Sequence, residues 1–334
     1  MSRLSEDDLI ATLFAPIAGP GGFGLRDDAA IVAHAPDEEL VVTVDALVSG
    51  VHFFPDDPPD AIAAKALGVN LSDLAAKAAQ PTGFLLSLAL PANWTAEWLE
   101  VFARGLREEA DRQACPLLGG DTVKTTGPLT LSVTAFGTVP RGRMLPRTGA
   151  RPGDAIYVSG TIGDSALGLQ LLLPHDTGSL GAVLAAGLDA ELQEALRQRY
   201  LRPQPRLALR AALQAHADGG MDVSDGLVGD VTKMLKASGT AGRVDLSCIP
   251  LSDAGRKATA LDARALSIVV TGGDDYEILA AIPRARASEF EKMAERAGIP
   301  VTRIGDVLDG TTAPVFHDAE GRTVTFDRGS FSHF

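Results

Sequence analysis

Residues 140–153 read PRGRMLPRTGARPG, a stretch that holds three prolines and three glycines. Proline and glycine both interrupt helices and strands, so their crowding here predicts a break in the organisation of the chain. The chain has 334 residues, and a chain of this length is expected to form two domains. We therefore expect one domain over residues 1–140 and a second over residues 141–334.

Helical and strand patterns occur on both sides of this break. Upstream, the sequence predicts strands at residues 40–44, 84–90 and 129–136 and helices at 60–79 and 95–113. Downstream, it predicts strands at 155–159, 266–270 and 278–282, and helices after residue 163, at 190–200 and 204–217, from 227, and at 290–297. Because helices and strands mix without strict alternation, an α+β fold is favoured over a doubly wound sheet.

The composition narrows the class of partner. The net charge of −13 argues against nucleic acid, whose phosphates attract basic proteins. Of the 43 acidic residues 29 are Asp, and short carboxylates suit hard divalent cations that can neutralise a phosphorylated ligand. An acidic surface that keeps the protein soluble is the other interpretation. The longest apolar run, Phe84–Leu90, is too short to span a membrane, and the single, distant Cys115 and Cys248 fit a reducing cytoplasm.

The common nucleotide and nucleophile motifs are absent. The sequence has no P-loop, no kinase HRD or DFG set and no Gly-x-Ser-x-Gly elbow. Gly19-x-Gly21-x-x-Gly24 matches the dinucleotide fingerprint, but it includes Pro20 and follows no strand, so we interpret it as a chance match.

Aspartates recur at the ends of apolar strands or beside glycines. Taken singly, each cluster is typical of a turn, but five in one chain favour a shared cation site. Asp73 adds to this set, because it shares one polar helix stripe with Asn70 and Lys77; an exposed Asp73–Lys77 ion pair is the alternative. The five clusters are Gly24–Asp28, Val42–Asp45, Gly119–Asp121, Asp222–Gly226 and Gly272–Asp275.

In their order along the chain, these motifs resemble those of the thiamine-monophosphate kinase family. That family is part of the superfamily of aminoimidazole ribonucleotide synthetase and selenophosphate synthetase. The resemblance runs from about Asp27 to the C-terminus, and Arg26 stands where the family usually has glycine. The motifs that carry it are Arg26–Ala30, Thr43–Phe53, Asn70–Asp73, Gly119–Thr122, Asp222–Gly226 and Gly272–Glu277.

The resemblance implies a fold and a reaction. The fold would be the two-domain aminoimidazole ribonucleotide synthetase-like one, with mixed and antiparallel sheets and packed helices. The N-terminal domain would carry the metal and ATP site and pair with a second copy in a homodimer, and the C-terminal domain would close the active site. The reaction would be in-line transfer of the ATP γ-phosphate to thiamine monophosphate, assisted by several Mg²⁺ ions, as the last step of thiamine diphosphate biosynthesis. The physical chemistry agrees, because an anionic phosphate nucleophile needs charge neutralisation and positioning more than a general base.

The resemblance also implies site residues. No general base or covalent nucleophile is expected among them. Val44 stands where the family often has a hydroxyl, so it would serve through its carbonyl; Asp274 replaces a longer Glu, and Phe331 would stack on a heterocycle. The implied metal ligands are Asp28, Thr43, Val44, Asp45, Asp73, Asp121, Asp222 and Asp225; the ATP contacts are Gly120, Asp121, Arg147 and Ser224; the acceptor contacts are His52, Asp274 and Phe331.

Two other functions stay open at this point. One is a related ATP-dependent synthetase. Two features count against it. A selenophosphate synthetase-like enzyme would have a reactive Cys near the N-terminus, but no Cys occurs before Cys115, and the hydrogenase-maturation relative ends in a cysteine, whereas this chain ends in His333-Phe334. The other is a non-catalytic nucleotide-binding partner, which would have no need of every acidic cluster.

Overall fold

The computed structural model describes residues 6–27, 29–327 and 329–331. The chain divides into two compact units. The first contains the residues up to Leu74 and Ala79–Met144, and the second contains Ala75–Ala78 and the residues from Leu145 onward. Each unit has its own sheet.

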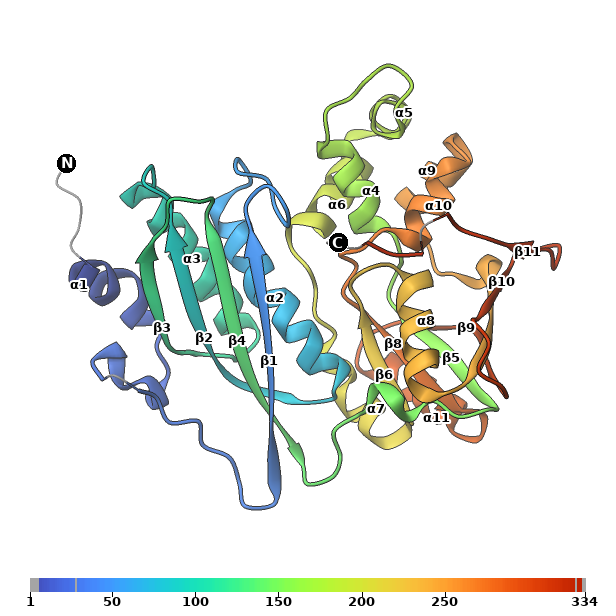
Figure 1. Ribbon diagram of the computed structural model, residues 1–334, viewed down its shortest axis with the longest axis horizontal. Coiled ribbons are helices and arrows are strands. Elements are labelled where there is room, and N and C mark those ends of the chain that lie inside the picture. Colours follow the sequence, from blue (N-terminus) through green and yellow to red (C-terminus); the bar gives the residue numbers. More distant parts are fainter. Residues whose placement is uncertain (1–5, 28, 328, 332–334) are drawn as a thin grey trace. The chain divides into compact units, whose positions relative to one another are not determined.

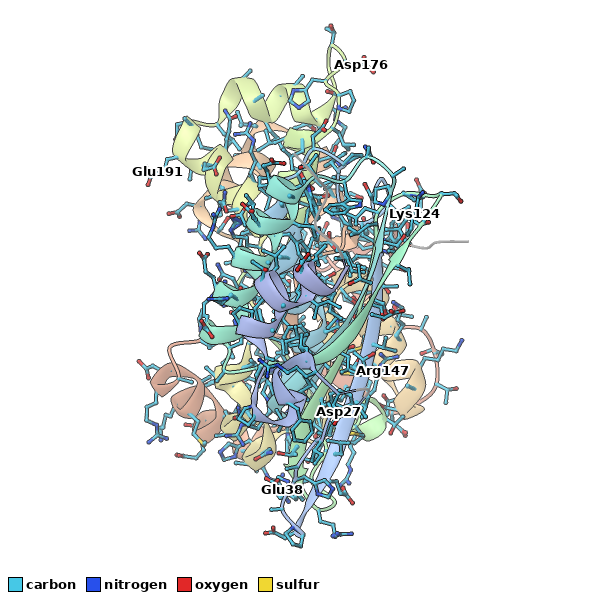
Figure 2. All side chains as sticks on the ribbon, turned by 90° about the vertical axis from the view of Figure 1, so that its left-hand side faces the viewer. Asp27, Glu38, Lys124, Arg147, Asp176 and Glu191 are labelled. Carbon is cyan, nitrogen blue, oxygen red and sulfur yellow. The ribbon has the colours of Figure 1, made fainter. Side chains whose placement is uncertain are left out.

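Four strands form the sheet of unit 1: β1 (Glu38–Val48), β2 (Gln80–Leu90), β3 (Leu117–Lys124) and β4 (Thr130–Pro140). Their order is β1-β4-β2-β3. β4 pairs antiparallel with both β1 and β2, whereas β3 pairs parallel with β2. Figure 2 shows Glu38, at the start of β1, and Lys124, at the end of β3, at opposite ends of this sheet.

Two long helices, α2 (Pro59–Ala76) and α3 (Ala96–Arg112), lie on the far side of this sheet in the view of Figure 1. A short helix, α1 (Glu6–Leu9), precedes the sheet in the chain. α3 begins after Thr95, whose side chain accepts the backbone N–H of Trp98 at 3.2 Å, and this cap satisfies one of the donors that a helix start leaves unpaired. One face of α3 buries Leu99, Phe102 and Leu106 against the unit.

Strand β1 presents two different faces. Val41 and Leu47 are buried, whereas Val42 and Val44 are exposed on the other face, Val44 by 60%. Since side chains alternate along a strand, Thr43 lies on the same face as Val41 and Leu47. Thr43 therefore faces α2 together with Val41 and Leu47, whereas Val42 and Val44 face away from it.

Seven strands form the sheet of unit 2, in the order β11-β10-β7-β9-β5-β8-β6. β5 pairs antiparallel with β8 and β9, and only β10 and β7 are parallel among the described pairs of this sheet. The strands are β5 (Asp154–Ser159), β6 (Gly219–Val223), β7 (Ala241–Asp245), β8 (Glu277–Pro283), β9 (Val301–Leu308), β10 (Val315–His317) and β11 (Thr323–Val324).

The interior strand β5 is buried on both faces, because its residues alternate between two hydrophobic clusters. Ile156 and Val158 belong to one cluster, and Ala155 and Tyr157 to the other. Its neighbour β8 divides in the same way. Strands covered on both faces read as continuous apolar runs, which is why 155–159 and 278–282 were predictable as strands.

Eight helices flank the strands of the described part of unit 2: α4 (Asp164–Leu172), α5 (Leu180–Gly187), α6 (Ala190–Leu201), α7 (Arg210–His216), α8 (Leu227–Ser238), α9 (Asp253–Leu261), α10 (Arg264–Thr271) and α11 (Ala287–Arg296). Helix α10 corrects the strand predicted at 266–270. The run of β-branched residues there favoured a strand, but Ala265, Val269 and Val270 are the buried positions, a spacing that marks one face of a helix.

The predicted α+β class is confirmed, since both sheets carry antiparallel pairs and helices pack beside them. Within the described residues, no helix is both long enough and apolar enough to cross a membrane.

Candidate functional site

In unit 1, β1 and α2 bring three predicted ligands together. The Thr43 hydroxyl donates to Asp73 Oδ2 at 2.5 Å, although the two residues are 30 positions apart in the sequence. The backbone N–H of Asp45 donates to Asn70 Oδ1 at 3.0 Å, which fixes the strand against the same helix. Thr43, Asp45 and Asp73 therefore form one polar cluster on the helix side of β1. Val44 lies on the opposite face, so only its carbonyl is compatible with this cluster.

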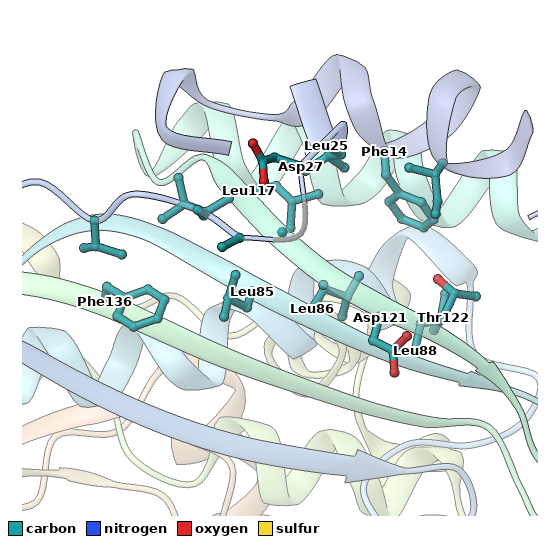
Figure 3. A pocket seen from close by; sticks show the side chains of 17 residues that line it. Phe14, Leu25, Asp27, Leu85, Leu86, Leu88, Leu117, Asp121, Thr122 and Phe136 are labelled. Carbon is teal, nitrogen blue, oxygen red and sulfur yellow. The ribbon is translucent and has the colours of Figure 1, made fainter. Parts of the chain in front are cut away.

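Asp121 and Gly120 lie on β3 and line a pocket of about 550 Å³ within unit 1. Its walls come from β2, β3, β4 and the N-terminal segment, and they are mostly apolar. Figure 3 shows Asp27 on the N-terminal segment and Asp121 on the strand side of this pocket. The predicted ligand Asp28 lies outside the described residues.

Glycine at position 120 is required by the spacing of β2 and β3. A Cβ added there would lie 2.0 Å from the carbonyl oxygen of Leu86, which is closer than any side chain tolerates. The wall of the pocket at Gly120 is therefore bare main chain, and a ligand can lie directly against it.

The donor atoms in unit 1 suit a hard cation. Thr43, Asp45 and Asp73 offer only oxygen, the ligand atom that Mg²⁺ prefers. Within the part of the chain that the structure describes, no three His, Cys, Asp or Glu side chains converge on one metal position. Mg²⁺ is usually bound by one or two carboxylates together with water and substrate phosphates, so this donor set fits a cation that a phosphorylated substrate helps to hold.

In unit 2, two loops interlock at the ends of β6 and β8. The backbone N–H of Asp274 donates to the carbonyl of Ser224 at 2.8 Å, and that of Tyr276 donates to the carbonyl of Val223 at 2.8 Å. Gly226 has a φ of +118°, and a Cβ there would lie 2.6 Å from the carbonyl oxygen of Thr271. Only glycine combines this backbone conformation with so close a contact.

The side chain of Asp230 on α8 binds the loop that follows β6. Its Oδ2 accepts the backbone N–H groups of Ser224 (3.1 Å) and Asp225 (3.0 Å), and its Oδ1 accepts the ammonium of Lys233 at 2.9 Å. The same ammonium contacts Asp225 Oδ2. Burial raises the pKa of Asp230 above its ordinary value, and the bond from Lys233 opposes that shift.

The C-terminal segment joins the same cluster. The backbone N–H of Phe331 donates to the carbonyl of Asp225 at 2.9 Å, while its ring is 51% exposed. Asp274 has a φ of +69° and accepts the hydroxyl of Tyr276 at 3.1 Å. Four predicted residues, Ser224, Asp225, Asp274 and Phe331, are thus linked by main-chain hydrogen bonds, and Asp222 is buried at the end of β6 beside them.

Two further predicted residues, His52 and Arg147, are each held by a main-chain contact. His52 follows β1 in unit 1, and its Nδ1 accepts the backbone N–H of Val48 at 3.0 Å. Arg147 opens a short 3₁₀ turn in unit 2, where its carbonyl accepts the hydroxyl of Ser238 at 3.2 Å and its side chain is exposed.

Comparison with known proteins identifies the family. Residues 26–139 match the family model for the N-terminal domain of AIR synthase related protein, and residues 151–317 match that for the C-terminal domain. The chain is 41% identical over 336 residues to a thiamine-monophosphate kinase of Caulobacter vibrioides, which covers 98% of this chain and 91% of the relative. The chain belongs to the thiamine-monophosphate kinase family. A Salmonella typhimurium member is 39% identical over 311 residues, covering 93% of this chain and 91% of the relative.

Solved structures of this kinase family share the fold. A thiamine-monophosphate kinase from Stenotrophomonas maltophilia K279a is 40% identical, with a TM-score of 0.79 over 90% of this chain and 91% of that one. A structure described as AaThiL complexed with AMPPCP and TMP is 29% identical, with a TM-score of 0.76 over 100% and 99%. The Escherichia coli hydrogenase maturation protein HypE, at 20% identity, shares the fold alone, with a TM-score of 0.74 over 97% and 98%. The expected two-domain fold is confirmed.

Sequence reasoning on this kinase family member assigned no role to two buried acids of unit 2, Glu277 and Asp230. Glu277 is fully buried and accepts Arg199 Nη2 at 2.9 Å, Ser159 Oγ at 2.6 Å and Arg206 Nε at 2.7 Å. Asp230 was also missed. Its signal was present, because it lies between Leu227 and Met234 on the apolar face of α8, where an acid needs a partner.

Proposed function

We propose that this chain transfers the γ-phosphate of ATP to thiamine monophosphate, which yields thiamine diphosphate and ADP as the last step of thiamine diphosphate biosynthesis. The observation that carries the proposal is the cluster of Ser224, Asp225, Asp274 and Phe331, joined by main-chain bonds in a chain that matches thiamine-monophosphate kinases along nearly its whole length. A relative bound to AMPPCP and TMP supports the same pair of substrates.

The pocket of unit 1 would take the nucleotide. Its volume of about 550 Å³ lies within the range of small-molecule sites, and its apolar walls suit a purine ring. Gly120 and Asp121 are predicted ATP contacts, and both line this pocket. Ser224 and Arg147 in unit 2 are the other predicted ATP contacts, Arg147 through a guanidinium fork that matches phosphate oxygens.

The acidic residues would hold divalent cations. Mg²⁺, when bound, neutralises phosphate charge that would otherwise keep two polyanionic substrates apart. Thr43 and Asp73 are already joined by a hydrogen bond, so one cation in contact with either side chain lies close to the other. Val44 would contribute its carbonyl only. The proposed ligands are Asp28, Thr43, Val44, Asp45, Asp73, Asp121, Asp222 and Asp225.

The reaction needs no general base from the protein. The nucleophile is a phosphate oxygen of thiamine monophosphate, which is anionic at neutral pH, and it attacks the γ-phosphorus in line as the bond to the β-phosphate oxygen breaks. The residues of the chain hold the two substrates and screen their charge. For the acceptor we propose His52, Asp274 and Phe331, with the exposed Phe331 ring stacking on a thiamine heterocycle.

We further propose a homodimer in the cytoplasm. The exposed valines Val42 and Val44 on the outer face of β1 form an apolar strip with Leu40, as a self-complementary interface requires. Cys115 and Cys248 are both free, which fits a reducing compartment. The net charge of −13 disfavours a nucleic-acid partner.

The test is a direct assay. Purified protein is incubated with MgATP and either thiamine monophosphate or free thiamine, and the products are separated by chromatography. We expect thiamine diphosphate from the monophosphate alone, and none after addition of EDTA. ATP binding without product from either acceptor would contradict the proposal and redirect the search to related synthetase substrates and then to a non-catalytic role.

A further inference from the structure

Lys233 on α8 contacts two carboxylates of different origin. Its ammonium donates to Asp230 Oδ1 at 2.9 Å, one helical turn earlier on the same helix, and to Asp225 Oδ2 in the preceding loop. The contact with Asp230 is set by the helix itself, because residues three apart lie on one face. The contact with Asp225 depends on the loop and on the rotamer of a long, flexible side chain.

The two carboxylates differ in their exposure and in their other hydrogen bonds. The Asp230 side chain is fully buried and already accepts two backbone N–H groups, so it is held in place. The Asp225 side chain is 41% exposed and Lys233 is 40% exposed, so solvent and solutes reach the ion pair between them. An exposed ion pair exchanges partners at low cost, whereas a buried, fully bonded carboxylate does not.

We infer that Lys233 is the built-in counter-cation of Asp225, that a divalent cation displaces its ammonium from Asp225, and that Asp230 retains the ammonium when this happens. This inference rests on the proposed function, because the displacing cation is one that the phosphoryl transfer would use. Lys233 is thus a positioning residue: it acts through the carboxylate that holds the cation.

Two consequences follow from the charges. Without a divalent cation, one ammonium serves two carboxylates, so Asp225 is held and partly neutralised. With a divalent cation at Asp225, the ammonium stays beside Asp230 and adds a repulsive positive charge nearby. Removal of the Lys233 charge should therefore strengthen divalent binding at Asp225 and weaken the folded protein when no cation is present.

The experiment measures Mn²⁺ binding to the full-length protein by electron paramagnetic resonance, without nucleotide. Lys233→Gln keeps the length and polarity of the side chain but removes its charge. We expect at least about threefold tighter binding at a site that Asp225→Asn abolishes, the scale of an exposed ion pair. Lys236→Gln, one turn later on the same helix and exposed, makes the same change in net charge and should leave the Mn²⁺ affinity unchanged. Equal or weaker binding in Lys233→Gln, or equal tightening in Lys236→Gln, would overturn the inference.

Thermal unfolding gives a second readout. In EDTA, Lys233→Gln should have a lower melting temperature than the wild type. Addition of Mn²⁺ should raise the melting temperature of Lys233→Gln by more than it raises that of the wild type. If Lys233→Gln folds only with Mn²⁺, the inference is supported; if it is unfolded with and without Mn²⁺, the inference is overturned. If the wild type forms product but Lys233→Gln does not change Mn²⁺ binding, this inference alone is overturned. If the wild type forms no product, the proposed function is overturned.

Discussion

The backbone N–H of Phe331 donates to the carbonyl oxygen of Asp225 at 2.9 Å, so the C-terminal segment is anchored to the loop that carries a proposed cation ligand. Because this bond uses main-chain atoms, the aromatic ring is left to face outward, and it is about half exposed. Any change that moves this segment should therefore act on the proposed acceptor contact of Phe331.

Gly229→Ala should displace this segment. A Cβ at position 229 would lie 2.3 Å from the Cβ of Ser330, so the two cannot both stay in place. We expect the KM for thiamine monophosphate to rise by about tenfold, the cost of one lost ring contact, while the KM for ATP changes little. Gly255→Ala on α9 is the matched control, since its Cβ would meet neighbours at an ordinary 3.5 Å. Steady-state kinetics with each substrate varied in turn give both KM values for each variant. Equal changes in the KM for thiamine monophosphate in Gly229→Ala and Gly255→Ala would refute the displacement.

Asp73→Asn should abolish turnover while the fold survives. The amide keeps the shape of the carboxylate and can still accept the Thr43 hydroxyl, but it loses the charge that a divalent cation requires. We expect kcat to fall by at least about a hundredfold. Circular dichroism checks the fold and coupled ADP release checks the rate. Full activity with unchanged metal dependence would remove Asp73 from the cation ligands.

His52→Ala should raise the KM for thiamine monophosphate more than the KM for ATP. The imidazole Nδ1 accepts the backbone N–H of Val48, which orients the ring at the end of β1. His52→Asn can keep an acceptor for that N–H, so it separates the loop contact from the proposed acceptor contact. A larger rise in the KM for ATP than for the acceptor in His52→Ala would contradict the assignment.

Glu277→Gln should destabilise unit 2 strongly. Glu277 pairs with the guanidinium groups of Arg199 and Arg206 in a fully buried position, and its loss removes the carboxylate that both contact. The expected fall in the free energy of unfolding is about 3–5 kcal/mol, measured by urea denaturation. Glu289→Gln, whose pair with Lys292 lies on the surface of α11, should unfold at the wild-type urea concentration. Similar effects from both substitutions would disprove the structural role of the buried cluster.

Asp275 should make stability depend on pH. Burial raises its pKa well above the ordinary value, and the backbone N–H of Gly163 opposes this only in part. The folded state therefore keeps this proton at pH values where the unfolded state has lost it, and the free energy of unfolding falls as the pH rises from about 4 toward the raised folded pKa. Asp275→Asn should flatten that fall in urea titrations at a series of pH values. An unchanged slope would show that Asp275 is ionised in the folded protein.

Local patterns were sufficient for part of the site. Asp73 was picked out by its place on the polar stripe of a predictable helix, whereas Thr43 was implied by the family resemblance; the structure joins the two across 30 residues. Their contact is observed; their role as cation ligands stays a prediction, as do the roles of the other proposed ligands.

Non-local contacts account for what the sequence did not reveal. Arg206 and Glu277 are 71 residues apart, and neither lies in a pattern that points to the other. The helix at α10 was predicted as a strand because Ile268, Val269 and Val270 favour strands locally, whereas burial of Ala265 with Val269 is decided by packing in unit 2. Strand β3 was not predicted either, since Gly119 and Gly120 are poor strand formers whose place is fixed by their pairing with β2.

The bare main chain at Gly120 has a consequence for the nucleotide preference of the proposed ATP pocket. Because Leu86 excludes any side chain there, this part of the pocket wall presents the same peptide atoms whatever substitutions accumulate elsewhere. In the proposed ATP pocket, a change of preferred base, whether by natural drift or by protein engineering, would have to come from lining positions that carry side chains, such as Leu25, Val32 and Phe136. The wall at Gly120 is therefore fixed, and new specificities would arise at the lining positions that carry side chains.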